Sequence, residues 1–142
     1  MFQNFDQTSD NRQCAARLAT LRERLRDAGL SGFLVPRSDA HQGEIVPARD
    51  ERLAWVTAFT GSAGKAVVMG DRAALFVDGR YTVQAKRQTD TDIFEVIAIH
   101  ETSVSEWLNS VALQGQRFGC DPWLPGGAEI EDLDKVLSER GA

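Results

Sequence analysis

The residues best suited to chemistry in this chain lie in one short turn, Asp78-Gly-Arg-Tyr81. Asp-Gly is a common turn dipeptide, and an arginine at such a turn usually carries a solvated surface charge. The Arg80 guanidinium also presents planar donors in a fixed arrangement, which suits a carbonyl or carboxylate of an extended ligand. Asp78 could orient this guanidinium or cap the helix that follows. The sequence therefore leaves two interpretations of Arg80, a surface charge or a ligand contact.

A second candidate pair, Asp39 and His41, follows a short apolar run that ends at Pro36. Residues two apart on an extended segment point to the same side, so these side chains would approach each other like an acid/base pair. A pair without a nucleophile, a metal or a third orienting group is weak evidence for catalysis. We therefore favour a hydrogen-bonded structural loop, with direct substrate contact as the alternative.

The segment Gly61-Ser-Ala-Gly-Lys65 has some likeness to a phosphate-binding loop. A Walker motif needs four residues between its glycines and a Ser or Thr after the lysine, whereas here two residues intervene and Ala66 follows. We expect the two glycines to provide backbone freedom in a tight turn, and Lys65 to be solvated.

Neither a metal site nor a disulfide framework is indicated. Cys14 and Cys120 are the two cysteines, and they stand far apart without a CxxC or Cys/His ligand pattern. His100 has only Glu101 beside it, and two ligands do not complete a metal site. We expect structural or tolerated cysteines, a surface or capping histidine, and no cofactor in this chain.

The chain of 142 residues carries a net charge of −5, with 42% apolar and 26% charged residues. That length and balance predict one globular domain over residues 1–142. The acidic balance argues against broad binding of nucleic acid or anionic membranes. Neither a signal sequence nor a membrane-spanning run of about 20 apolar residues is evident, so we expect a cytoplasmic protein.

Helical and extended segments alternate along the sequence and must position the candidate residues. A hairpin at Gly70-Asp71 requires its two strands to pair antiparallel, so the alternation predicts an α/β sandwich on one mixed sheet. The expected helices run from Ser9 or Asp10 to Gly29, over 52–59, after 81, over 103–112 and over 129–140. The expected strands cover 32–36, 65–69, 73–77, 93–99 and 117–121.

Side chains at helical spacing indicate which helix faces are buried. In the first helix the apolar face consists of Leu18, Leu21, Leu25 and Ala28. The helix over 103–112 begins with Ser103 or Ser105 as its cap and directs Trp107, Leu108 and Val111 inward. Trp123 lies between prolines in a loop and is expected to be exposed, where it would suit a domain or dimer contact.

Three blocks resemble, in order and spacing, the N-terminal domain of the longer, cytosolic type of Xaa-Pro aminopeptidase, in the creatinase/prolidase superfamily of metallopeptidases (family M24). These blocks are Arg37-Ser-Asp-Ala-His-Gln42, Thr57-Ala-Phe-Thr-Gly-Ser-Ala-Gly64 and Val77-Asp-Gly-Arg-Tyr81. The resemblance covers residues 11–140 or so. It implies a ribonuclease H-like, three-layer sandwich with a central mixed sheet between helices.

The resemblance also implies a division of labour. In that family the enzyme is a hydrolase that releases the N-terminal residue preceding proline, with two divalent metals, usually manganese, activating a water. The metals belong to a catalytic "pita-bread" domain that is absent from this chain, so the chain itself holds no catalytic residue. The implied partners are that catalytic domain of the same polypeptide, a proline-containing peptide, and a second subunit in a homodimer.

Site residues are carried over from the family only where the blocks match. Arg80 inherits a contact with the bound peptide, and the loop with Asp39 and His41 inherits a position facing the second domain or a neighbouring subunit. We therefore take Arg80, His41 and Asp39 as the candidate substrate-binding residues. Gly43-Glu-Ile45 stands where relatives commonly have Ser-Glu-Tyr, so any role of that tyrosine does not transfer.

Two other functions are compatible with the fold. Peptidase-like domains also serve as stand-alone protein-binding modules, as in a histone-chaperone subunit, although the long acidic region expected there is not seen. Creatinase and prolidase share the domain plan and act on a small guanidino acid or on dipeptides. The blocks over 37–42 and 59–64 favour the aminopeptidase.

Overall fold

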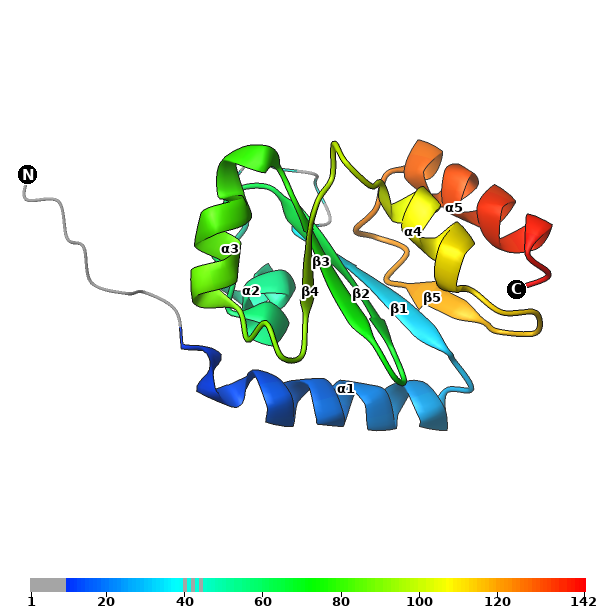
Figure 1. Cartoon of the computed structure of the whole chain (residues 1–142), viewed down its shortest axis with the longest axis horizontal. Helices are drawn as coiled ribbons and strands as arrows, with labels where there is room; N and C mark the ends of the chain where they lie inside the picture. Colours follow the sequence, from blue (N-terminus) through cyan, green and yellow to red (C-terminus); the bar gives the residue numbers. More distant parts are fainter. Residues whose placement is uncertain (1–9, 40, 42, 44) are drawn as a thin grey trace, which may run out of the picture.

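A five-stranded mixed sheet forms the centre of the protein in the computed structural model, which describes residues 10–39, 41, 43 and 45–142 (Figure 1). The strand order is β4-β3-β2-β1-β5. The strands are β1 (Gly32–Pro36), β2 (Gly64–Met69), β3 (Ala73–Val77), β4 (Glu95–Ala98) and β5 (Phe118–Cys120). The helices are α1 (Cys14–Asp27), α2 (Arg52–Thr57), α3 (Thr82–Gln88), α4 (Val104–Val111) and α5 (Gly127–Glu139), with short 3-10 turns η1 (Asn11–Gln13), η2 (Ala48–Asp50) and η3 (Gly79–Tyr81). The α/β class, the mixed sheet and the alternation of elements are as the sequence predicts.

The strand directions bring four strand ends to one edge of the sheet. β2 is antiparallel to both β1 and β3, while β5 is parallel to β1 and β4 is parallel to β3. The hairpin between β2 and β3 closes where predicted, with Met69 N–H donating to Arg72 O at 2.8 Å. β1, β3, β4 and β5 therefore all finish at the same edge, which we call the carboxyl edge and define by the residues that follow them, 37–39, 78–80, 99–100 and 121. In open α/β sheets this is the edge where ligands usually bind.

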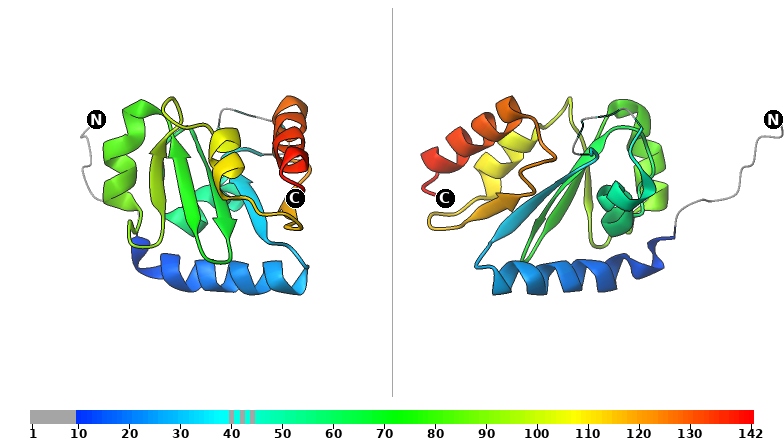
Figure 2. Two further views of the ribbon diagram at one scale, coloured as in Figure 1. Left: turned by 45° about the vertical axis from the view of Figure 1, so that its right-hand side comes forward. Right: turned by 180° about the vertical axis from the view of Figure 1, so that it is seen from behind.

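Helices cover both faces of the sheet, which makes three layers (Figure 2). Alternate residues of each strand point to opposite faces, and they form two separate cores. One core packs α1, α2 and α3 against one face, with Val35, Val68 and Leu75 at its centre. The other packs α4 and α5 against Leu34 and Phe76 on the opposite face. Burial of both faces accounts for the nearly continuous apolar runs in β2 and β3.

The ends of the first helix follow their capping residues. Asp10 caps η1 by accepting a hydrogen bond from Arg12 N–H, and Gly29 ends the helix with a φ of 69°. Leu18 and Leu25 are buried as expected. Ala28 is exposed, against expectation, because it is the C-cap where the chain leaves the helix. The alternative cap, Ser9, lies outside the described residues, and none of the described helices is long and apolar enough to cross a membrane.

The clearest difference from the sequence prediction concerns the strand expected over 93–99. β4 comprises only residues 95–98, because the N–H groups of Ile93 and Phe94 both donate to Asp90 O and close a turn. Phe94 is still buried, at 1% exposure, so its apolar character reflects packing beneath the turn rather than pairing in the sheet. Periodicity alone does not separate these two uses of an apolar residue.

Ser103, rather than Ser105, caps α4 through a complete capping box. Ser103 Oγ accepts from Glu106 N–H at 3.2 Å, and Glu106 Oε2 accepts from Ser103 N–H at 2.7 Å. The backbone N–H of Ser103, and after it the Ser103 side chain, hold the pKa of Glu106 below its ordinary value. Ser103→Ala is therefore expected to lower the free energy of unfolding by about 1 kcal/mol, measured by urea denaturation. The matched control is Ser105→Ala, which removes the same hydroxyl from α4 beyond the cap. An equal loss for both variants would contradict this assignment of the cap.

The tryptophans occupy different environments. Trp107 is 5% exposed and stacks edge-on against Phe76, with ring centroids 5.8 Å apart. Trp123 is 73% exposed, which confirms the expectation for that loop. Trp55 is 50% exposed, and the Arg17 guanidinium lies 5.0 Å from its ring centroid. Trp55 and Trp123 thus remain on the surface.

Candidate functional site

The blocks that stand out in the sequence meet at the carboxyl edge. Arg37, directly after β1, donates its N–H to Gly64 O at 3.1 Å and its Nη1 to Ser62 O at 3.1 Å. The Ser62 side chain in turn forms a hydrogen bond with the Tyr81 hydroxyl, at the end of η3. One residue of each block is thereby linked to the next, although 44 positions separate Arg37 from Tyr81 (81 − 37).

A buried aromatic ring supports this junction from below. Phe59 is 1% exposed, and its ring meets that of Tyr81 edge-on, with centroids 5.7 Å apart and an interplanar angle of 77°. The chain passes so close to Phe59 at Gly61 that a Cβ there would lie 2.2 Å from Phe59 Cζ. The glycine in the second block is therefore required by close packing rather than by phosphate binding.

Asp78 performs both of the roles considered for it. Its Oδ1 accepts from Arg80 N–H and from Arg80 Nε, each at 3.0 Å, so one carboxylate caps η3 and orients the guanidinium. The backbone N–H of Arg80, and after it the Arg80 side chain, lower the pKa of Asp78. The same side-chain hydrogen bond raises the pKa of Arg80. The pair is fixed by two bonds within one turn.

The outer part of the Arg80 side chain remains available. The side chain is 75% exposed, and its guanidinium carbon lies 5.6 Å from the centroid of the Tyr81 ring. Asp78 engages Nε alone, and neither terminal nitrogen bonds to any residue that the structure describes. Arg80 can thus offer two parallel donors to a carbonyl or carboxylate outside this chain.

Asp39 and His41 do not form the side-chain pair that an extended segment would give. The chain turns after Ser38, and Asp39 Oδ1 accepts from the backbone N–H groups of His41 and Gly43, both at 2.9 Å. The bond from Gly43 is the main cause of a lowered pKa of Asp39, which is 6% exposed. The His41 side chain is exposed. Neither residue bonds to Arg80 within the described part of the chain.

Lys65 was expected to be solvated, but its ammonium group is paired. It forms an ion pair with Glu129, the third residue of α5, and the two side chains are 25% and 26% exposed. Because Lys65 is the second residue of the antiparallel strand β2, it lies near the carboxyl edge and can reach the start of α5. Sequence spacing gave no sign of this pairing, since 64 positions separate the two residues.

The remaining candidates carry no site. His100 is exposed and lies against Gly79, where a Cβ would approach its Cε1 to 2.9 Å. Cys14 and Cys120 are free, and burial raises the pKa of both thiols. No three or more His, Cys, Asp or Glu side chains gather to hold a metal among the described residues.

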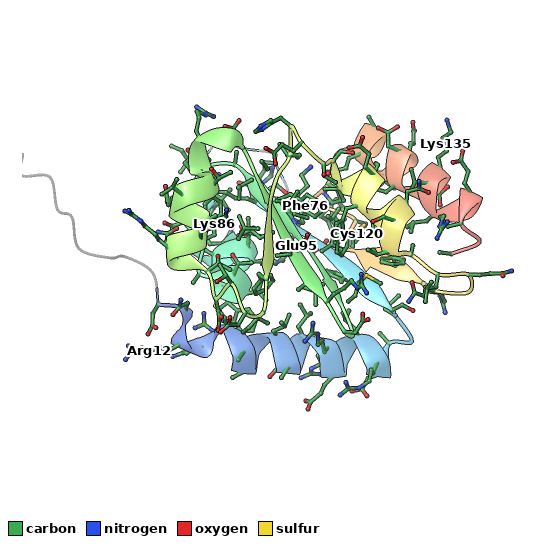
Figure 3. The ribbon with its side chains drawn as sticks, in the orientation of Figure 1. Arg12, Phe76, Lys86, Glu95, Cys120 and Lys135 are labelled. Atoms are coloured by element: carbon green, nitrogen blue, oxygen red, sulfur yellow. The ribbon has the colours of Figure 1, made fainter. Side chains whose placement is uncertain are left out.

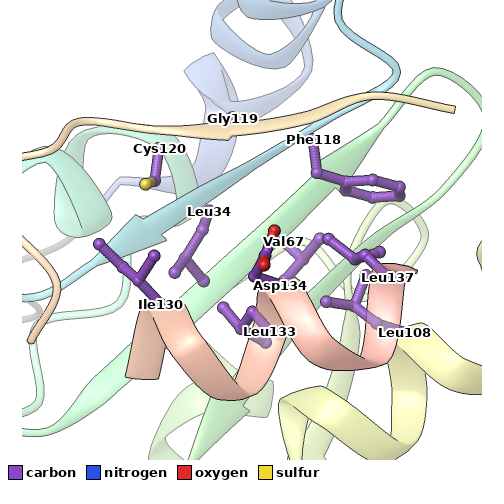
Figure 4. A pocket seen from close by; sticks show the side chains of 10 residues that line it. All are labelled: Leu34, Val67, Leu108, Phe118, Gly119, Cys120, Ile130, Leu133, Asp134 and Leu137. Atoms are coloured by element: carbon purple, nitrogen blue, oxygen red, sulfur yellow. The ribbon is translucent and has the colours of Figure 1, made fainter. Parts of the chain in front are cut away.

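A cavity of about 120 Å³ lies between the sheet and α5, away from Arg80 (Figure 4). Its lining is almost entirely apolar, with Asp134 as its one charged residue. The labelled residues come from β1, β2, α4, β5 and α5, and most of them belong to the second core. We interpret it as a packing gap rather than a binding site, because no convergent polar groups accompany it.

The fold and the carboxyl edge define a family, and comparison with known proteins identifies it. The family model of the creatinase/prolidase N-terminal domain matches residues 17–141, so the chain belongs to this family. The N-terminal domain of PepQ, a cytoplasmic peptidase of Mycobacterium tuberculosis, is similar with a TM-score of 0.64 and 25% identity, covering 89% of this chain and 88% of that one.

Within the family, the chain corresponds to the N-terminal domain of Xaa-Pro aminopeptidase-like proteins. It is 38% identical over 125 residues to Xaa-Pro aminopeptidase 2 of Rattus norvegicus, covering 87% of this chain and 18% of the relative. The X-prolyl aminopeptidase of Caenorhabditis elegans, described as a cytosolic enzyme with a di-nuclear active site, matches with a TM-score of 0.81 and 28% identity. That match covers 90% of this chain and 23% of the C. elegans chain. The chain thus spans about a fifth of the length of these enzymes.

Proposed function

We propose that this chain is the non-catalytic N-terminal domain of an Xaa-Pro aminopeptidase, and that it contributes Arg80 to the binding of the peptide substrate. The observation that carries the proposal is the state of Arg80 at the carboxyl edge. Its Nε is fixed by Asp78 while its terminal nitrogens bond to no described residue. The similarity to Xaa-Pro aminopeptidases supplies the reaction, release of the N-terminal residue before proline.

The proposal assigns the metal chemistry to another part of the polypeptide. The described residues of this chain offer no cluster of metal ligands, so no catalytic step is assigned to them. Two divalent metals, manganese by expectation, would be held by a catalytic domain and would activate the attacking water. The C. elegans relative is described as having a di-nuclear active site, which supports this division.

Arg80 would then act by binding and orienting the substrate. An extended peptide presents backbone carbonyls and a terminal carboxylate, and a guanidinium with two open donors can hold either in a defined direction. Asp78 anchors one end of the guanidinium by accepting a hydrogen bond from Nε. Such positioning places the scissile bond relative to the catalytic groups.

The loop with Asp39 and His41 is a second, weaker part of the proposed substrate cleft. Asp39 uses one oxygen for two backbone bonds and thereby shapes the loop. His41 is exposed on that loop and is the group available for a contact with substrate, a second domain or a second subunit. We also propose a cytoplasmic location and a homodimeric parent, in which exposed aromatic residues such as Trp123 suit a contact surface.

The proposal is tested with the full-length polypeptide that contains this sequence. Purified enzyme loaded with manganese is expected to release the first residue from Xaa-Pro-Xaa tripeptides and to leave the matched Xaa-Ala-Xaa peptides intact. Hydrolysis of dipeptides alone, or of creatine, would place the chain with prolidase or creatinase instead. A native polypeptide of only this length in cell extract would exclude a catalytic domain in the same chain and favour a stand-alone binding module.

A further inference from the structure

The hydroxyl pair formed by Ser62 and Tyr81 is the least expected feature of the carboxyl edge. Tyr81 is the single tyrosine of the chain. It follows Arg80 directly, and its hydroxyl bonds to the Ser62 side chain, 19 positions away. Both residues belong to the blocks singled out in the sequence, yet the proposed contact of Arg80 with a peptide needs neither of them as a ligand.

The Tyr81 ring has two defined contacts, and its hydroxyl has a hydrogen-bond partner. The buried Phe59 ring meets it edge-on, and the Arg80 guanidinium lies 5.6 Å from its centroid. The hydroxyl is held by Ser62, whose carbonyl oxygen accepts from Arg37 Nη1 at 3.1 Å. The ring thus contacts Phe59 and the Arg80 guanidinium, while its hydroxyl is bonded to Ser62 in the turn at 61–64.

The contact with the Tyr81 ring restricts a motion of the Arg80 guanidinium that the hydrogen bond to Asp78 leaves open. Asp78 holds Nε within the turn but leaves the plane of the guanidinium free to tilt about that single bond. A ring beside the guanidinium attracts the cation and disfavours tilting, provided that the ring itself does not move. The bond to Ser62 and the contact with Phe59 are what hold the ring.

We propose that Ser62 and Tyr81 are positioning residues, whose hydroxyl pair holds the tyrosine ring so that the terminal nitrogens of Arg80 face the peptide. The inference rests on the proposed function, because it assigns to the pair an effect on substrate binding that acts through Arg80. Neither hydroxyl touches the substrate in this arrangement. Loss of the pair should therefore weaken binding of the peptide without changing the chemical step.

The hydroxyl pair can be tested on this chain alone, independently of any enzyme activity. The hydrogen bond between the Ser62 side chain and Tyr81 lowers the pKa of the Tyr81 phenol. Because there is one tyrosine, absorbance of the phenolate during a pH titration reports Tyr81 directly. Ser62→Ala should raise the titration midpoint toward that of free tyrosine, and Ser62→Thr, which keeps a hydroxyl, should restore it. A titration midpoint that is unchanged in Ser62→Ala would contradict the hydrogen bond between Ser62 and Tyr81, and with it the inference.

The effect on function is measured in the full-length enzyme. Tyr81→Phe keeps the ring and removes the hydroxyl, and Ser62→Ala removes its partner. Each is expected to raise KM for an Xaa-Pro tripeptide by about 3- to 10-fold with kcat nearly unchanged, as for one neutral hydrogen bond. The double variant should show no greater loss than either single one. Ser62→Thr should return KM to the original value.

An Arg80→Ala background separates the inference from the proposed function. If the pair acts through Arg80, adding Tyr81→Phe to Arg80→Ala changes KM no further, whereas a general structural role would still lower activity. A normal KM for Tyr81→Phe together with a raised KM for Arg80→Ala would overturn the inference and leave the proposed function standing. Unchanged KM in Arg80→Ala itself would remove the proposed role of Arg80, and the inference with it.

Discussion

Replacing Arg80 with alanine in the full-length enzyme should raise KM for Xaa-Pro peptides by about 10- to 100-fold, as expected for the loss of one charge-assisted hydrogen bond. The reason is that the terminal nitrogens of Arg80, which bond to nothing in the described chain, are the donors that the substrate would use. Metal content should not change, because no metal ligand is altered. Arg80→Lys should give an intermediate loss, since an ammonium keeps the charge but not the planar pair of donors.

The chain provides a matched control for this variant. Arg12 resembles Arg80 in part, because Asp10 Oδ1 accepts from its backbone N–H at 3.0 Å and from its Nε at 2.9 Å, but its Nη2 also donates to Asp10 Oδ2 at 2.8 Å. Arg12 lies beside the start of α1 (Figure 3), and Cys14 at that start is close to Asp90, which follows the end of α3. Arg80 precedes the start of α3, so the two arginines lie near opposite ends of this helix. Arg12→Ala should therefore leave KM unchanged. Equal effects of the two substitutions would show that Arg80 matters only to local structure.

The largest effect on stability is expected at the centre of the sheet. Phe76 in β3 is fully buried and packs edge-on against Trp107 of α4. Phe76→Ala should lower the free energy of unfolding by about 3–5 kcal/mol, because it removes buried surface and leaves a cavity between β3 and α4. The total free energy of unfolding of a typical domain is only about 5–15 kcal/mol, so this substitution would remove much of the stability.

Urea denaturation measures this effect as a shift of the unfolding midpoint at constant slope. Val83→Ala is the control, because Val83 is 63% exposed and its truncation should change stability by less than about 0.5 kcal/mol. If Phe76→Ala does not fold, Phe76→Leu should fold with a smaller loss. A Phe76→Ala protein as stable as the Val83→Ala control would contradict the central place of Phe76 in the second core.

The sequence was sufficient to predict the helices and strands, but it did not predict the contacts between them. Hydrophobic runs and turn residues predicted the five strands and five α-helices found among the described residues, because local propensity and tertiary packing agree in these segments. The strand over 93–99 was too long, since Phe94 is apolar for packing beneath a turn. The residues of the candidate site were proposed from the three blocks, and they stay predictions, with Arg80 suggested by its planar donors and Asp39 and His41 by their spacing.

The unpredicted contacts are those that join distant parts of the chain. Lys65 meets Glu129 because α5 returns to the carboxyl edge, and Ser62 meets Tyr81 because β2 and β3 form a hairpin. In both cases the partner is set by topology, which neither spacing nor residue type encodes locally. The bonds of Asp39 are a local exception, because its partners lie two and four positions away in a turn where we expected an extended segment.

The order of the strands in the sheet has a consequence for synthesis of the protein. β2 and β3 are joined by a tight hairpin, whereas the junction of β1 with β5 unites residues 86 positions apart, as in the bond from Arg117 N–H to Ser31 Oγ. Pairings between such distant segments form slowly and only after both have been made. β5 and α5, which complete the second core over Leu34 and Val67, leave the ribosome after the other described elements of this domain. We therefore expect a nascent chain to keep this face of its sheet open to chaperones until α5 emerges.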